Sequence, residues 1–182
     1  MIRLGSNSQT RAVILKSHGI DFIQNGGNFD EDSIKTLNPK SFVYQATLGK
    51  YNELIRKYGC EDMPLLVADS VVTSNGELLR KAKDENDARR MLNLQSASET
   101  SVITCMIYKS KQKELIDISI TTYEFLEFSK KDIEDYIKSG ECFGKAGAIM
   151  VEGFCKPYIK TVKGYESTAM GLCVEKLKSL ID

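Results

Sequence analysis

The feature that most constrains the fold is the run Leu65-Leu66-Val67-Ala68-Asp69-Ser70-Val71-Val72, in which six apolar residues surround one acid and one hydroxyl. This composition predicts a buried strand over residues 64–73, and Asn75-Gly76 predicts a tight turn into a second strand. A buried carboxylate is costly unless it is paired. Asp69 is therefore either a structural carboxylate or an active-site acid, and the strand alone does not decide between them.

Strand-like and helix-like segments alternate along the rest of the chain. A polar cap residue marks the start of most of the helices, such as Asn38 before Pro39. Beside the two strands above, we expect strands near residues 2–5, 21–24, 101–108, 115–128, 148–151 and 158–162. We expect helices up to residue 17 and over residues 39–59, 87–94 with Asp84 as the cap, 129–140 and 167–180. This alternation predicts an α/β fold with a mixed sheet.

Length and charge narrow the class of protein. The chain has 182 residues, which fits one domain with a core of its own. Lysine plus arginine and aspartate plus glutamate number 25 each, so no overall basic field draws the chain to nucleic acid. The apolar runs are too short to span a bilayer, and the first residues do not resemble a signal peptide. We therefore expect a cytoplasmic protein that binds neither nucleic acid nor a membrane.

Cysteine and histidine are poorly placed for catalysis or metal binding. The five cysteines are scattered without a CxxC pair, which argues against a disulfide framework or a thiolate metal site. His18 is the only histidine, so zinc chemistry and Ser-His-Asp catalysis are excluded as main hypotheses. Carboxylates, lysines and hydroxyls must carry any enzymatic reaction.

Two segments could bind an anion. The stretch Ser6-Asn7-Ser8-Gln9-Thr10-Arg11 places hydroxyls and an arginine at a helix start, although it could equally be a simple helix cap. In Phe143-Gly144-Lys145-Ala146-Gly147-Ala148 small residues surround one lysine, although a turn that needs glycine would look the same. The chain contains neither the P-loop pattern nor the dinucleotide fingerprint.

Taken in order, these fragments resemble the Maf family of house-cleaning nucleoside triphosphate pyrophosphatases. The match runs over nearly the whole chain, and the order and spacing of the fragments make it specific. The segments that carry the resemblance are residues 4–15, Asp30-Glu31, Lys50, Ala68-Asp69-Ser70-Val71-Val72, Lys81, Ser96 with Val102 and Thr104, residues 136–148, and Gly171-Leu172.

The resemblance implies a fold, a reaction and a set of site residues. The fold would be an elongated, curved mixed sheet flanked by helices, with two lobes and a central cleft in a single domain over residues 1–182, frequently as a homodimer. The reaction would hydrolyse the α–β phosphoanhydride of a nucleoside triphosphate with a divalent cation, Mg²⁺ or Mn²⁺. Asp69 would be the catalytic acid and Glu31 a second carboxylate near the metal. The implied triphosphate-binding residues are Ser6, Arg11, Lys50, Lys81 and Lys145.

The chain departs from the family pattern at the periphery of this set. Gln9-Thr10-Arg11 stands where Pro-Arg-Arg is usual, so one arginine is missing, and Gly144 replaces an aspartate. Thr10, Ser70 and Glu152 occupy the positions linked to base choice and match neither the dTTP/UTP branch nor the 7-methyl-GTP branch. The base, whether non-canonical or pyrimidine, therefore stays open.

Two alternatives to an active enzyme remain. The first is a catalytically weakened, nucleotide-binding regulator of cell division, which the missing arginine favours. The second is an interaction protein whose lysines are all solvated.

Overall fold

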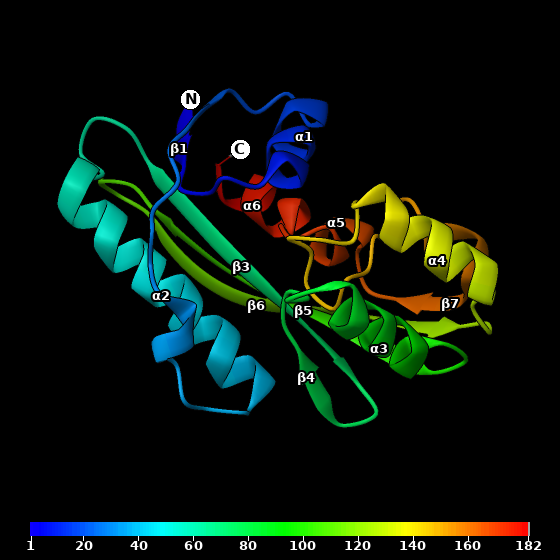
Figure 1. Ribbon diagram of the computed structural model, residues 1–182. Helices are drawn as coiled ribbons and strands as arrows, with labels where there is room; N and C mark the ends of the chain where they lie inside the picture. Colours follow the sequence, from blue (N-terminus) through cyan, green and yellow to red (C-terminus); the bar gives the residue numbers. More distant parts are fainter. Residues whose placement is uncertain (182) are drawn as a thin grey trace. The chain divides into compact units, whose positions relative to one another are not determined.

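A mixed α/β architecture is seen in the computed structural model, which describes residues 1–181 (Figure 1). The strands are β1 (Ile2–Leu4), β2 (Phe22–Gln24), β3 (Leu65–Ser74), β4 (Glu77–Leu79), β5 (Glu99–Lys109), β6 (Glu114–Phe125) and β7 (Ile159–Lys163). The α-helices are α1 (Gln9–Ser17), α2 (Pro39–Tyr58), α3 (Glu85–Gln95), α4 (Lys130–Ser139), α5 (Glu166–Ala169) and α6 (Val174–Ile181). Two short 3₁₀ helices, η1 (Glu31–Ser33) and η2 (Lys156–Tyr158), complete the elements.

The strands form one seven-stranded sheet in the order β2-β1-β3-β5-β6-β7, with β4 paired to β3. β1 runs parallel to both β2 and β3, whereas β4 and β7 are antiparallel to β3 and β6. Parallel and antiparallel pairs in one sheet make it mixed, and helices flank it (Figure 1). The predicted fold class is confirmed.

Local signals place most of the elements correctly. The β3–β4 turn has Asn75 and Gly76 at φ of 49° and 78°, the left-handed conformation that this dipeptide favours. The side chain of Asn38 caps α2 through the Ser41 amide, and Gly140 ends α4 in the left-handed conformation.

Two predicted elements are wrong. Residues 148–151 form turns and irregular backbone instead of a strand, because Gly147 and Ala148 both have positive φ, 63° and 58°, which strand geometry excludes. The predicted helix over residues 167–180 is two helices, α5 and α6, because Gly171 interrupts it at a φ of 108°. The strand expected to reach residue 128 ends at Phe125.

The chain divides into two compact units, and β3, β5 and β6 each contribute residues to both. Unit 1 contains Met1–Ser70, Thr104–Ser119 and the chain from Gly171, and unit 2 contains Val71–Ile103 and Ile120–Met170. The prediction of a single domain stays a prediction.

Each unit has its own apolar core. In unit 1, Leu54 of α2 packs against Leu65 and Val67 of β3. In unit 2 a larger cluster includes Tyr136 of α4, whose ring is stacked on that of Phe154 at a centroid distance of 4.4 Å.

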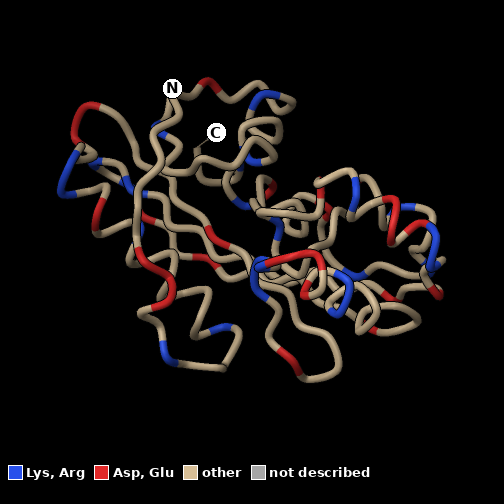
Figure 2. Tube along the Cα trace, in the orientation of Figure 1, with Lys and Arg blue, Asp and Glu red and all other residues tan. Residues whose placement is uncertain are grey.

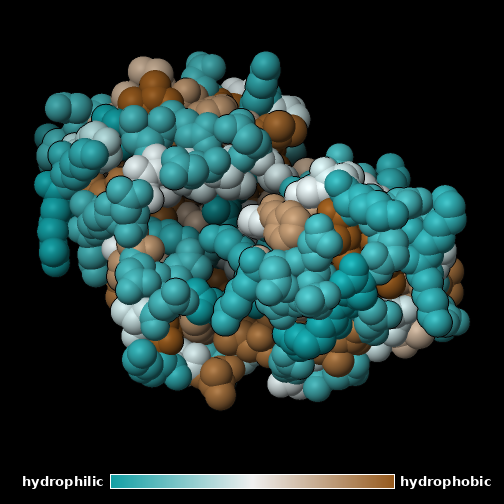
Figure 3. Space-filling model, viewed as in Figure 1, coloured by the Kyte–Doolittle hydropathy of each residue, from teal (hydrophilic) through white to brown (hydrophobic). Residues whose placement is uncertain are grey.

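Charged residues of both signs are interspersed along the trace (Figure 2), and hydrophilic side chains cover most of the face shown in Figure 3. Within residues 1–181, none of the helices combines the length and the apolar character that crossing a membrane requires.

Candidate functional site

Strand β3 presents Asp69 and Ser70 to opposite faces of the sheet, because successive side chains of a strand alternate. Asp69 therefore shares a face with Leu65 and Val67, which pack on Leu54 of α2. Ser70 points to the other face, where its hydroxyl binds residues of α1 and β5. α2 and α1 lie on different sides of β3 in Figure 1. Candidate residues therefore gather on both faces of this strand.

On the α2 face, Lys50 joins two carboxylates. Its Nζ lies 3.1 Å from Asp69 Oδ2 and 2.7 Å from Glu31 Oε1. Helical spacing puts Lys50 on the same side of α2 as the buried Val43 and Leu54, which directs the ammonium toward β3. Asp69 is only 5% exposed, and within residues 1–181 its Oδ2 has no hydrogen bond beyond this ion pair. An acid, a lysine and a second acid thus form one cluster.

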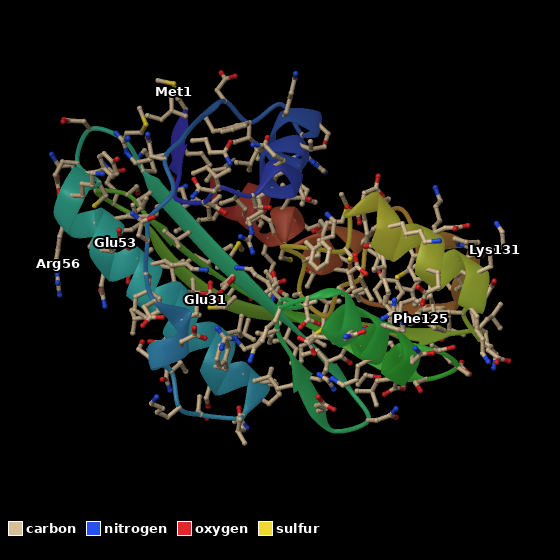
Figure 4. All side chains as sticks on the ribbon, viewed as in Figure 1. Met1, Glu31, Glu53, Arg56, Phe125 and Lys131 are labelled. Atoms are coloured by element: carbon tan, nitrogen blue, oxygen red, sulfur yellow. The ribbon has the colours of Figure 1, made fainter. Side chains whose placement is uncertain are left out.

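The segment before Glu31 is fastened to α2. The Asn28 amide donates to both carboxylate oxygens of Glu53, at 3.0 and 3.1 Å, and the Phe29 ring packs on Gly49. Asp30 then caps η1 by accepting a hydrogen bond from the Asp32 amide. Figure 4 shows Glu53 on α2 and Glu31 on the segment that runs along this helix. These contacts bring Glu31 to Lys50.

On the α1 face, the buried guanidinium of Arg11 connects α1 with β3 and with the loops that carry Ser6 and Gly171. Its Nε donates to the Gly171 carbonyl at 2.7 Å, its Nη1 to Ser6 Oγ at 3.0 Å and its Nη2 to Ser70 Oγ at 3.2 Å. Ser70 Oγ is in turn 2.8 Å from Thr104 Oγ1 of β5. Three nitrogens of Arg11 therefore already have partners within the chain.

The charge of Arg11 is balanced by the acids on the α2 face. Burial lowers the pKa of the Arg11 guanidinium from its ordinary value, and the negative charges of Asp69 and Glu31 oppose this effect. Arginine nevertheless stays protonated in proteins. The cluster therefore contains two carboxylates and two cations.

The remaining predicted residues lie in unit 2, except for Thr10, which is half-buried in α1. Lys81 and Ala146 form an antiparallel bridge, and the Gly147 amide donates to the Arg80 carbonyl at 2.9 Å. The bridge places Lys81 beside the segment that carries Lys145. Glu152 lies in the turns that follow, half-buried.

Sequence reasoning missed two glutamines that fix these loops. The Gln24 amide donates to the Ser6 carbonyl at 2.7 Å and to the Ser8 carbonyl at 3.2 Å. The buried Gln95 amide donates to the Gly147 carbonyl at 2.7 Å. Gln95 could have been noticed as a polar residue among the apolar positions of its helix, whereas Gln24 carries no such signal.

The donors of the cluster suit one class of metal ion. Glu31 and Asp69 supply carboxylate oxygens, the ligands that Mg²⁺ and Mn²⁺ prefer, and within residues 1–181 Asp69 Oδ2 has no partner besides its ion pair with Lys50. Across residues 1–181 there is no group of three or more histidine, cysteine, aspartate or glutamate side chains that could hold a metal ion. Two carboxylates fit a hard cation that also takes water and phosphate oxygens as ligands.

Comparisons with known proteins agree over the full length. The profile of the family described as "Maf-like protein" matches residues 1–182. A nucleoside triphosphate pyrophosphatase of a Nitratiruptor species is 51% identical over 182 residues, covering 99% of this chain and 98% of the relative. Proteins with the same name from Helicobacter pylori and Campylobacter jejuni are 40% and 34% identical, covering 96% and 100% of this chain and 91% and 100% of their own lengths.

Proposed function

This chain belongs to the Maf-like protein family, and from that premise we propose that it is a hydrolase, a nucleoside triphosphate pyrophosphatase. We further propose that it cleaves the α–β phosphoanhydride to give a nucleoside monophosphate and pyrophosphate. The names of the relatives support the first statement. The observation that carries the proposal is the cluster in which Lys50 lies between Asp69 and Glu31.

Asp69 is the proposed general base. A water molecule near its carboxylate would lose a proton to Asp69 as its oxygen bonds to the α phosphorus. The bond from the α phosphorus to the bridging oxygen would break, and its electron pair would leave with pyrophosphate. A positioned base of this kind contributes typically 10²–10⁴-fold to a rate.

The cations of the chain are proposed to bind the polyphosphate. Negative charge on the phosphate oxygens is stabilised by fixed cations aimed at it. Lys50 already lies in the cluster, and the bridge between Lys81 and Ala146 supports a joint role for Lys81 and Lys145. Ser6 would contribute its hydroxyl and the backbone amides of the α1 start. Arg11 would act mainly by holding Ser6 and Ser70 in place.

A divalent cation, Mg²⁺ or Mn²⁺, is proposed to be held by Glu31 and Asp69. When bound, it would neutralise charge on the phosphate oxygens. Besides its proposed role in binding the polyphosphate, Lys50 would hold the two carboxylates in place while they are not binding a cation.

The base of the nucleotide is proposed to be non-canonical or a pyrimidine, with Thr10, Ser70 and Glu152 as the residues that select it. Ser70 is the best supported of the three, because its hydroxyl is fixed between Arg11 and Thr104. Ser70→Thr would keep this hydroxyl and add a methyl group to the Cβ atom that carries it, and a change in the ratio of kcat/KM between dTTP and a purine triphosphate would reveal the role.

The reaction is tested by incubating the protein with a panel of nucleoside triphosphates and Mg²⁺ or Mn²⁺ in ¹⁸O-labelled water. We expect one monophosphate and one pyrophosphate per turnover, with ¹⁸O in the monophosphate, since attack is at the α phosphorus. Release of inorganic phosphate and a diphosphate would contradict the cleavage site. If no nucleotide is hydrolysed, the proposal of an enzyme is overturned in favour of a nucleotide-binding regulator. Turnover in EDTA at the full rate would overturn the metal requirement.

A further inference from the structure

The segment that delivers Glu31 to the cluster approaches α2 more closely than ordinary side chains allow. It follows β2 and runs along the helix before η1 begins (Figures 1 and 4). Glycine occupies both sides of the contact, with Gly27 in the segment and Gly49 in the helix. A Cβ on Gly27 would lie 2.8 Å from Glu53 Oε2.

Gly49 is unusual because glycine in the interior of a helix is destabilising relative to alanine. The space that a side chain would need is filled by the Phe29 ring. A Cβ on Gly49 would lie 2.3 Å from two atoms of that ring and 2.6 Å from a third. The ring therefore packs directly on the bare helix backbone.

This contact lies next to the functional cluster. Gly49 precedes Lys50, whose Nζ lies 2.7 Å from Glu31 Oε1, and Phe29 is two residues before Glu31. One turn further along α2, Glu53 holds the Asn28 amide. The ring and the Glu53 carboxylate thus fasten the two residues before Asp30, and Glu31 follows at a fixed distance along the chain.

We propose that Phe29 and Gly49 are positioning residues for Glu31, and that the ring seated on the glycine sets the Glu31 carboxylate beside Lys50. The functional part of this inference rests on the proposed pyrophosphatase activity. A glycine that weakens the helix is explained by the close packing that it permits.

Gly49→Ala separates positioning from stability, because the two effects have opposite signs. Alanine favours the helix, so the melting temperature should stay the same or rise. The added methyl group would displace Phe29, and with it Glu31. We expect kcat/KM, and the affinity for Mn²⁺ measured by electron paramagnetic resonance, to fall about 10-fold or more, the usual effect of losing a residue that orients a metal ligand. Amide hydrogen exchange over residues 25–34 should become faster.

Asn52→Ala is the matched control. Asn52 is exposed on α2, so its substitution also favours the helix. It should leave kcat/KM, the affinity for Mn²⁺ and the hydrogen exchange over residues 25–34 unchanged. Phe29→Leu in the Gly49→Ala background should cause little further loss, because either change alone removes the same contact.

If Gly49→Ala and Asn52→Ala have the same kcat/KM, the same Mn²⁺ affinity and the same hydrogen exchange over residues 25–34, the proposal is overturned. If Gly49→Ala lowers the melting temperature, the single variant Phe29→Leu tests the proposal instead, since it does not change the helix. Faster exchange over residues 25–34 together with the same loss of Mn²⁺ affinity supports the proposal. Native exchange and native Mn²⁺ affinity overturn it. If the native protein neither binds Mn²⁺ nor hydrolyses nucleotides, the proposed function fails. Hydrogen exchange still tests the contact in that case.

Discussion

Removing the guanidinium of Arg11 should destabilise the protein strongly, and Arg11→Met tests this. Methionine keeps the apolar part of the side chain but loses the bonds to Gly171, Ser6 and Ser70. The Gly171 carbonyl comes from a part of the chain 160 residues away. The substitution therefore unties the chain after α5 from α1 and β3.

The magnitude follows from the three hydrogen bonds. A hydrogen bond from a charged donor contributes about 1.5–3 kcal/mol. The sum overestimates the loss, because removing Arg11 also removes the cost of burying its charge. We expect the free energy of unfolding to fall by about 3 kcal/mol. For a chain of this length, about 2–4 °C is lost per kcal/mol, so the melting temperature should fall by roughly 6–12 °C.

Urea denaturation followed by circular dichroism measures this change, with the slope against urea checked for constancy. The matched control is Arg56→Met, because Arg56 is exposed on α2 (Figure 4) and its loss should change stability by less than about 0.5 kcal/mol. Arg11→Lys should restore little of the loss, since an ammonium cannot replace the planar fork of donors. A change for Arg11→Met no larger than that of the control would refute the structural role.

Three further outcomes are expected. Gly171→Ala should lower the free energy of unfolding measured by urea titration by about 1–3 kcal/mol, because residue 171 has a φ of 108° and its Cβ would lie 3.3 Å from Arg11 Nε. A variant with native stability would contradict this expectation. Burial raises the pKa of Cys105 to about 11 and of Cys155 to about 12, above the ordinary value of 9.0. The folded state thus keeps protons that the unfolded state loses, so these two thiols should leave the urea midpoint unchanged below pH 9 and lower it as the pH rises toward 11. Cys105→Ala should reduce this fall, and an equal fall in the variant would contradict the prediction. Sedimentation equilibrium should give twice the chain mass of 20.4 kDa if the protein is the homodimer that the family resemblance implies, and the single mass would contradict it.

Most of the fold could be predicted because its signals are local. The apolar run of β3, the Asn75-Gly76 turn and the Asn38 cap each depend on neighbouring residues, and each is where the sequence places it. The failures have distant causes. Gly147 is held by Gln95, and Gly171 by Arg11, so the turns at these two positions depend on contacts that no local pattern reveals.

The site could be predicted only in part. Asp69 and Lys50 were both identified as candidates, but their ion pair was not predicted, because it joins two segments that no local pattern brings together. Only the family resemblance placed Glu31 near Asp69, and no local pattern does so, because its position depends on the packing of Phe29 against Gly49. The prediction for Arg11 was also incomplete, because the sequence does not distinguish an exposed arginine at a helix start from one that donates to a distant carbonyl.

The most direct test of the account is pyrophosphate release by Asp69→Asn compared with the native protein, on the best nucleotide and with saturating Mg²⁺. Asparagine keeps the shape of the side chain but cannot accept the proton, so we predict that kcat falls by about 10²–10⁴-fold. Hydrogen exchange over residues 65–74 should remain native and show that β3 is intact. A variant with an intact β3 that retains near-native kcat would contradict the assignment of Asp69 as the base.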